Sequence, residues 1–170
     1  MSEPVAADRL LPGLRIPANR VSRRAVAYWT ARSVLETLVV LAAETIGATI
    51  GGFTPTWMTV LAGSAVLLGV RAVIMPQWRY RVHRWEVTGE ALYTRAGWFS
   101  VHWHIAPISR IQTIDSHRSL GERIFGLANV TATTASAAGP VRIRGLDTVT
   151  ADRLLDQLAV VTSRSPGDAT

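Results

Sequence analysis

The sequence predicts a protein of two parts: a two-helix transmembrane hairpin, followed by a β-rich domain that a C-terminal amphipathic helix caps. Three observations predict this fold class. Two long apolar stretches occupy residues 26–50 and 57–75, short segments of alternating polarity follow Pro76, and an apolar stripe with helical spacing lies near the C-terminus. Alternation with a period of two is typical of half-buried strands, whereas a period of 3.6 is typical of helices.

The composition narrows the possible classes of function. The chain of 170 residues is 48% hydrophobic and has a formal net charge of +6. All its basic residues are arginines, and it has no cysteine, which excludes disulfides, thiolate metal sites and cysteine nucleophiles. A positive charge favours an anionic partner, either nucleic acid or a phospholipid surface. The apolar stretches favour the phospholipid surface, and we expect no nucleic-acid partner.

The predicted hairpin occupies residues 26–76 and follows a polar, basic segment, residues 1–25, whose first eight residues are expected to be disordered. Each apolar stretch is close to the ~20 residues with which a helix crosses the hydrocarbon core. The uncharged connection at residues 51–56 contains Gly-Gly and a proline, which are turn signals. The alternative is a buried helical hairpin in a soluble protein.

Arginines flank both outer ends of the hairpin: Arg20, Arg23 and Arg24 before it, and Arg79, Arg81 and Arg84 after it. By the positive-inside rule, both termini are expected in the cytosol and the short connection on the opposite side of the membrane.

The predicted cytosolic domain spans residues 77–162, and a disordered tail, residues 163–170, follows it. Its first strand is expected within residues 79–88, where a change in the phase of alternation near His83 predicts a β-bulge or bend. Further strands are expected at residues 91–96, 102–106, 111–117, 128–134 and 141–145. A helix should begin after Asp147 or Thr148, with an apolar stripe of Ala151, Leu154, Leu155, Leu158 and Val161.

Charged residues inside the hairpin are the first candidate site. Glu36 lies one turn after Arg32, and an antiparallel hairpin would place Arg71 at a similar depth. Because an unpaired charge near the middle of a bilayer costs roughly 2.5–3.5 kcal/mol, we expect Glu36 to pair with Arg71 or Arg32.

Glu44 has no obvious cationic partner, so we expect it to be protonated or hydrogen-bonded to Ser64 or Thr59. A simple membrane anchor does not need two buried acids. We therefore interpret Glu36, Glu44, Arg71 and Arg32 as an interface with another membrane protein, with a proton or cation pathway as the alternative.

Several motifs after the hairpin occur together in one known family. They are Glu90-Ala91-Leu92, Pro107 with Arg110-Ile111-Gln112, Glu122-Arg123, Phe125-Gly126-Leu127 and Gly145-Leu146. In this combination the chain resembles the bacterial pleckstrin-homology-like (PH-like) membrane proteins of the YdbS type. The resemblance implies a PH-like sheet or barrel capped by the C-terminal helix, in the bacterial inner (plasma) membrane. It implies no catalytic residues, and it suggests a larger relative with several such domains as partner.

A second candidate site is a polar recognition edge on the domain, formed by Arg110, Gln112, Arg123, Arg142 and Arg144. It could bind a phosphate or a partner strand. The alternative is structural: Arg110 pairs with Glu122 or Asp115 and fixes the sheet to the segment around residue 122. The neighbouring Ile124, Phe125 and Leu127 are expected to pack in the core.

Catalytic and metal sites have little support in the sequence. It contains neither a phosphate-binding glycine-rich motif nor a dinucleotide fingerprint. His102 and His104 share a face of one strand but lack further ligands nearby, and His83 and His117 are expected at the surface. We therefore expect no catalytic residue, no metal and no cofactor.

Three hypotheses of function follow. The first is a non-enzymatic membrane-anchored adaptor whose PH-like domain binds a protein partner at the membrane face. The second is a sensor of anionic lipid headgroups, which the juxtamembrane Arg79, Arg81 and Arg84 would face together with Arg142 and Arg144. The third is a small transporter or proton-handling subunit that uses the intramembrane acids. The expected partners are anionic lipids and another membrane protein, either the larger relative or a second copy.

Overall fold

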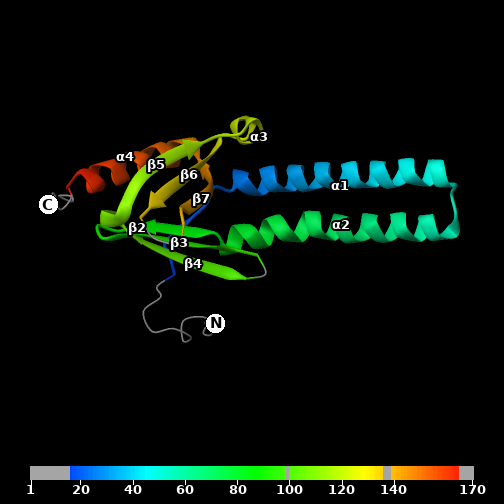
Figure 1. The fold of residues 1–170 in the computed structure, drawn as a ribbon, viewed down its shortest axis with the longest axis horizontal. Helices are drawn as coiled ribbons and strands as arrows, with labels where there is room; N and C mark the ends of the chain where they lie inside the picture. Colours follow the sequence, from blue (N-terminus) through cyan, green and yellow to red (C-terminus); the bar gives the residue numbers. More distant parts are fainter. Residues whose placement is uncertain (1–15, 99, 136–138, 165–170) are drawn as a thin grey trace, which may run out of the picture.

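A long helical hairpin projects from one end of a domain with two β-sheets in the computed structural model, which describes residues 16–98, 100–135 and 139–164 (Figure 1). The expected disorder of residues 1–8 concerns a part of the chain outside these ranges, as does most of the expected C-terminal tail. Residues 163 and 164 of that tail belong to the last helix.

The hairpin consists of helices α1 (Arg24–Gly51) and α2 (Pro55–Val82), each 28 residues long. At 1.5 Å per residue, each helix extends about 42 Å, which exceeds the ~30 Å of the hydrocarbon core. Only 6% of the most apolar window of each helix is buried inside the structure. A soluble protein would cover such surfaces, so the alternative of a buried helical hairpin does not fit this structure.

Helix α2 continues past Pro76, where the sequence predicts the end of the second span. Residues 79–82, predicted to lie in the first strand, belong instead to the last turns of α2, and the backbone N–H of His83 donates to the carbonyl of Arg79 at 2.9 Å. A membrane helix tolerates proline where neighbouring groups pack around it, and Pro76 is fully buried. The change of phase near His83 therefore marks a boundary between helix and strand, and the predicted β-bulge is wrong.

The first antiparallel sheet has the order β1-β2-β3-β4, and the second has the order β5-β6-β7. Their bounds are β1 Asn19–Arg20, β2 Arg84–Val87, β3 Ala91–Gly97, β4 Val101–Pro107, β5 Ile111–His117, β6 Leu127–Thr134 and β7 Val141–Asp147. A 3₁₀ turn, η1 (Ile108–Arg110), joins the sheets, and a short helix, α3 (Leu120–Ile124), joins β5 to β6. Each strand predicted from residue 91 onward is present within two residues of its expected bounds.

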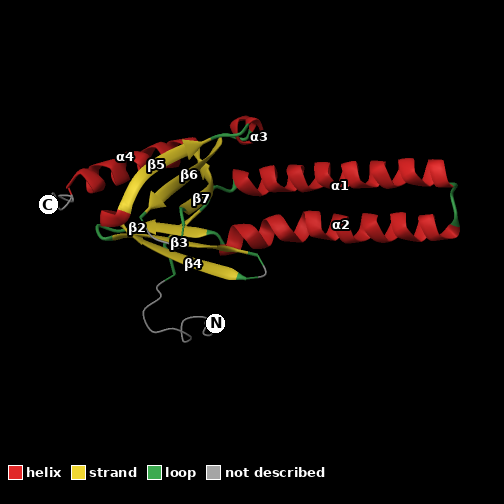
Figure 2. Ribbon diagram, in the orientation of Figure 1, coloured by secondary structure: helices red, strands yellow, loops and turns green. Residues whose placement is uncertain are grey.

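Helix α4 (Thr148–Arg164) covers the second sheet, as Figure 2 shows. The Asp147 carboxylate accepts a hydrogen bond from the backbone N–H of Thr150 at 2.9 Å, which fixes the start of the helix. Ala151, Leu154 and Leu158 are buried in one cluster with side chains of both sheets. The predicted fold class, two apolar helices followed by a sheet domain and a capping helix, is confirmed.

Strand β1 was not predicted, because a strand of two residues is too short to show alternation. Asn19 and Arg20 pair with Trp85 and Arg84 of β2, so the chain on both sides of the hairpin contributes to one sheet. Val21, Ala25 and Trp29 are also buried in the domain core. The folded domain therefore includes residues of the predicted basic segment, 1–25, and of the predicted hairpin, 26–76.

The start of α1 packs closely against β7 at Gly145. The backbone N–H of Ser22 donates to the Gly145 carbonyl at 2.9 Å, and a Cβ at Gly145 would lie 2.8 Å from the Cβ of Ala25. Gly145 also has a φ of +79°, which other residues rarely adopt. This contact, together with β1, fixes the domain against the base of the hairpin.

Candidate functional site

Glu36 lies between two arginines in the hairpin. Its Oε1 accepts a hydrogen bond from Nε of Arg32 at 2.9 Å, and its Oε2 lies 3.6 Å from Nη2 of Arg71 in α2. The antiparallel hairpin thus brings together the three charged residues that the sequence places at a similar depth. Glu36 has counter-charges within its own chain, and its role at an interface with another protein stays a prediction.

Glu44 lies farther along α1, and its Oε1 accepts a hydrogen bond from the Ser64 hydroxyl at 2.8 Å. Ser64 is one of the two residues predicted as hydrogen-bond partners of Glu44. The other, Thr59, donates instead to backbone carbonyls of its own helix. The second oxygen, Oε2, is buried without a hydrogen-bond partner among the described residues. In this structure Glu44 therefore joins α1 to α2.

Glu44→Gln should leave the stability of the hairpin nearly unchanged, because the amide oxygen still accepts from Ser64. Glu44→Leu should weaken helix association by about 0.6 kcal/mol, the average for hydrogen bonds between membrane helices, and by no more than the maximum of about 1.7 kcal/mol. Reversible unfolding in bilayer discs measures both values. Ser64→Ala should cost a similar amount, and adding Glu44→Leu to it should cost little more. An equal loss for Glu44→Gln and Glu44→Leu would contradict this assignment.

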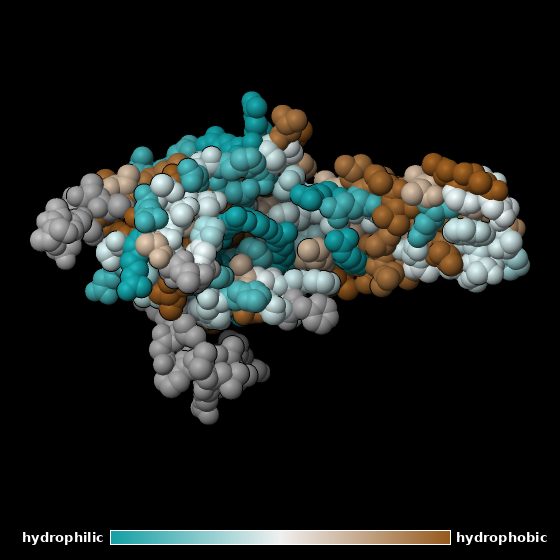
Figure 3. All heavy atoms as spheres, viewed as in Figure 1, coloured by the Kyte–Doolittle hydropathy of each residue, from teal (hydrophilic) through white to brown (hydrophobic). Residues whose placement is uncertain are grey.

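A cavity of about 530 Å³ lies where α2 meets the domain. Arg79 and His83 from the end of α2, His102 and His104 from β4, and Arg142 and Arg144 from β7 contribute to its lining. Figure 3 shows hydrophilic residues gathered around a hollow at the junction of domain and hairpin. A second cavity of about 540 Å³ shares Arg79 and Arg144 with the first and extends toward Glu36, Arg71 and Glu122.

Arg79 has a fixed position between these two cavities. Its guanidinium carbon lies 4.3 Å from the centroid of the Trp29 ring in α1, a cation–π contact. The Arg79 carbonyl accepts from the His83 backbone, and Arg79 Nε lies 3.5 Å from the His83 ring. The side chain predicted to face lipid therefore points into the junction between hairpin and domain.

The other juxtamembrane arginines do not join Arg79. Arg81 is exposed, and Arg84 belongs to β2, where its Nη1 donates to the Pro17 carbonyl at 3.4 Å. The lipid-facing group of three arginines predicted from the sequence is therefore divided, because α2 ends at Val82 and the chain changes direction there.

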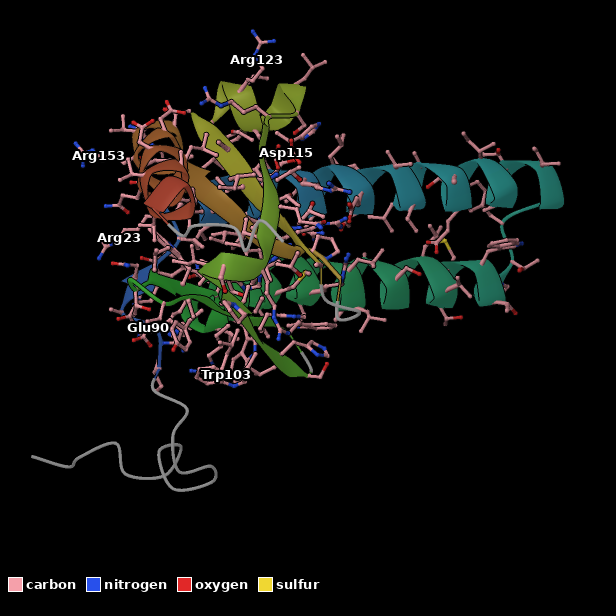
Figure 4. The ribbon with its side chains drawn as sticks, turned by 60° about the vertical axis from the view of Figure 1, so that its left-hand side comes forward. Arg23, Glu90, Trp103, Asp115, Arg123 and Arg153 are labelled. Carbon is pink, nitrogen blue, oxygen red and sulfur yellow. The ribbon has the colours of Figure 1, made fainter. Side chains whose placement is uncertain are left out.

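The predicted recognition edge is likewise not one surface. Arg142 and Arg144 line the first cavity, whereas Arg110 lines a different cavity beside Pro107 and Val141. Gln112 is exposed on β5, and Arg123 points outward from α3 in Figure 4. Within the described ranges, Arg110 forms no ion pair with Glu122 or Asp115. The Glu122 carboxylate instead accepts hydrogen bonds from the Ser119 backbone and the Asn129 side chain, at 2.8 and 2.6 Å.

His83 is buried, with 8% of its surface exposed, and not at the surface as predicted. Its ring lies 5.6 Å from the Trp29 ring, and its Nδ1 is 2.9 Å from the Arg79 carbonyl oxygen. Burial, together with the positive charges of Arg79 and Arg144, lowers the pKa of His83 to about 4. The prediction of a surface position was wrong because His83 lies at the boundary between helix and strand, which the sequence pattern did not show.

Because the folded state resists protonation of His83, the domain should lose stability as the pH falls. The unfolded chain takes up a proton near pH 6.5 and the folded chain only near pH 4, so stability is greatest above pH 6.5 and declines between these values. The expected loss from pH 7 to pH 5 is about 2 kcal/mol. Thermal unfolding should show this slope, and His83→Gln should flatten it. His117→Gln is the matched control, and an equally flat profile in that variant would contradict the assignment.

Helix α3 presents two apolar side chains that sequence reasoning missed. Leu120 and Ile124 are 78% and 82% exposed, although Ile124 was predicted to lie in the core. The helix has only one turn, and Phe125 and Leu127, which follow it, occupy the core side instead. A capping box between Ser119 and Glu122 holds the turn, and Ser119-x-x-Glu122 is the sequence signal that could have located it.

The described residues contain no group of three or more His, Cys, Asp or Glu side chains with the geometry to hold a metal ion. His102 lies 2.9 Å from the Ser100 hydroxyl, and His104 lines the basic cavity. Cationic and neutral hydrogen-bond donors thus surround one cavity, and an exposed apolar turn lies beside the hairpin.

Comparisons with known proteins agree with the two-part fold. The family model described as a bacterial PH domain matches residues 36–161. The UPF0699 transmembrane protein YdbS of Bacillus subtilis (strain 168) is 28% identical over 147 residues, which cover 84% of this chain and 91% of that protein. No solved structure matches. The two apolar helices and the likeness to a transmembrane protein identify a membrane protein. Because the family model covers most of the chain, this protein belongs to the bacterial PH domain family.

Proposed function

We propose that this protein is a membrane-anchored, non-enzymatic adaptor in the bacterial inner membrane. Its two termini and its PH domain lie in the cytosol, and the domain binds another membrane protein at the membrane face. The arginines at both outer ends of the hairpin support this orientation. The partner is a larger relative with several PH-like domains.

The observation that carries this proposal is the exposed apolar pair of α3. Leu120 and Ile124 lie four residues apart and so share one side of the turn. Helix α3 lies beside the start of α1 in Figure 1, and the Tyr28 ring of α1 is 5.7 Å from the Phe125 ring that follows α3. A membrane protein packed against α1 would therefore also reach Leu120 and Ile124.

The turn is held rigidly, as a binding surface requires. Asn129 donates to Glu122 and accepts from the backbone N–H of Gly145 at 3.0 Å, which connects α3 to β6 and β7. The pKa of Glu122 lies below its usual range: burial acts to raise it, but hydrogen bonds from Ser119 and Asn129 outweigh burial. A preorganised apolar surface loses little conformational entropy when a partner binds.

The test uses the absence of cysteine from the chain. Ile124→Cys labelled with a photoreactive benzophenone should form an adduct with a membrane protein that contains PH-like domains when the cells are illuminated. Arg153→Cys, on the exposed face of α4 and far from the hairpin in Figure 4, is the matched control and should form none. Adducts with lipid alone, or equal amounts of protein adduct from both positions, would contradict the proposal. Adducts between two copies of this chain would show that the partner is a second copy and not the larger relative.

A further inference from the structure

The cavity at the end of α2 gathers three arginines, and its lining contains no acidic residue. Arg79 comes from α2, and Arg142 and Arg144 come from β7. In the described part of the chain, neither Arg142 nor Arg144 forms an ion pair: the pairs present there join Glu36 to Arg32 and Arg71, and Arg118 to Asp152. Within the described ranges, no carboxylate of this cavity's lining offsets the repulsion between these arginines.

The register of β7 places two of these arginines on one side. Arg142 and Arg144 are exposed, whereas Val141, Ile143 and Gly145 are buried on the opposite face of the strand. Residues two apart in a strand are about 6.6 Å apart, so the two side chains can converge on one small anion. Arginine presents its N–H donors in a planar fork that matches the oxygens of a phosphate group.

Arg79 supplies the third cation from a fixed position. Its stacking on Trp29 restricts the side chain, so little conformational entropy remains to be lost when an anion binds. The positive potential at this position also affects His83. Burial is the largest cause of the lowered pKa of His83, and the charges of Arg79 and Arg144 lower it further. His102 and His104 line the same cavity and add ring nitrogens that can donate to an anion.

We propose that this cavity binds a phosphate group, which Arg79, Arg142 and Arg144 contact together. The group has two possible sources with the same chemistry, the headgroup of an anionic phospholipid and a soluble phosphate. The cavity lies at the base of the hairpin, where Met75 of α2 also lines it, so both a headgroup and a solute can reach it. This site uses only three of the five arginines in the lipid-sensor hypothesis, and it is distinct from the α3 surface of the proposed adaptor.

The test uses the full chain in bilayer discs of two compositions. In discs that contain 20 mol% phosphatidic acid in phosphatidylcholine, mass spectrometry of the protein released from the discs counts retained anionic lipid. In discs of phosphatidylcholine alone, calorimetric titration with inorganic phosphate measures binding of the soluble anion. The double variant Arg142→Gln/Arg144→Gln should weaken the binding of lipid or of inorganic phosphate, whichever the unmodified chain binds, about tenfold or more. Both positions are exposed, so its thermal unfolding should match that of the unmodified chain.

The matched control, Arg81→Gln/Arg153→Gln, removes the same charge from exposed positions that line none of the cavities described above. If the unmodified chain and the control retain anionic lipid and Arg142→Gln/Arg144→Gln does not, the cavity binds a lipid headgroup. If inorganic phosphate binds saturably and only Arg142→Gln/Arg144→Gln loses this binding, the cavity binds a soluble phosphate. An equal loss in the control would indicate attraction by net charge alone and overturn the proposal, as would the absence of binding in both arms.

Discussion

Leu158→Asp is expected to unfold the PH domain. Leu158 has 0% exposed surface and lies in the cluster that joins α4 to both sheets. Removing a buried leucine side chain costs about 2–5 kcal/mol, and burying a carboxylate without a counter-charge costs several kcal/mol more. The sum is comparable to the ~5–15 kcal/mol that holds a whole domain folded. Limited proteolysis and near-ultraviolet circular dichroism of the full chain in detergent should both show the loss.

Gln157→Asp is the matched control, because it introduces the same charge at the neighbouring exposed position of α4. Its protease resistance should be close to that of the unmodified chain. A Leu158→Asp variant with a native spectrum and an intact, resistant domain would mean that α4 does not cover the core.

Glu36→Leu is expected to destabilise the hairpin by leaving two arginines without their counter-charge. The Glu36 carboxylate now contacts Arg32 at 2.9 Å and Arg71 at 3.6 Å. An unpaired arginine in the hydrocarbon region costs up to about 3 kcal/mol, and less where the side chain reaches the interface. Lower yield in the membrane fraction and a lower unfolding temperature in bilayer discs should report the effect.

Arg71→Leu added to Glu36→Leu should restore much of the loss, because the pair is then replaced by apolar groups. A loss in the double variant that is smaller than the sum of the two single losses is the signature of a pair that acts together. Ile46→Leu, at an exposed apolar position of α1, is a control for changes of lipid-facing surface and should have little effect. Additive losses from Glu36→Leu and Arg71→Leu would contradict the ion pair.

The sequence predicted those elements whose pattern repeats over many residues. This holds for the two spans, the strands from residue 91 onward and α4. Each of them buries one face or exposes an apolar surface, so its apolar residues recur at regular spacing in the sequence. Strand β1 and the last turns of α2 were missed for a common reason. The structure around residue 83 depends on contacts between segments more than sixty residues apart, such as Arg84 with Pro17, and no local pattern encodes them.

The candidate site was predictable to a similar extent. The alternation in β7 placed Arg142 and Arg144 on one face, and the helical spacing placed Glu36 near Arg32. The inward orientation of Arg79 could not be predicted, because it depends on the position of Trp29 in the other helix of the hairpin. The exposure of Ile124 was also missed, since an apolar residue next to core residues gives no sign of the side on which a one-turn helix presents it.

Cysteine labelling in spheroplasts tests most directly whether a two-span hairpin carries one cytosolic domain. The chain has no cysteine of its own, so Phe53→Cys in the connection between α1 and α2 and Arg153→Cys in α4 provide single probes. A membrane-impermeant maleimide should label residue 53 in intact spheroplasts, and residue 153 only after the membrane is permeabilised. Labelling of residue 153 in intact spheroplasts, or of residue 53 only after permeabilisation, would contradict the account.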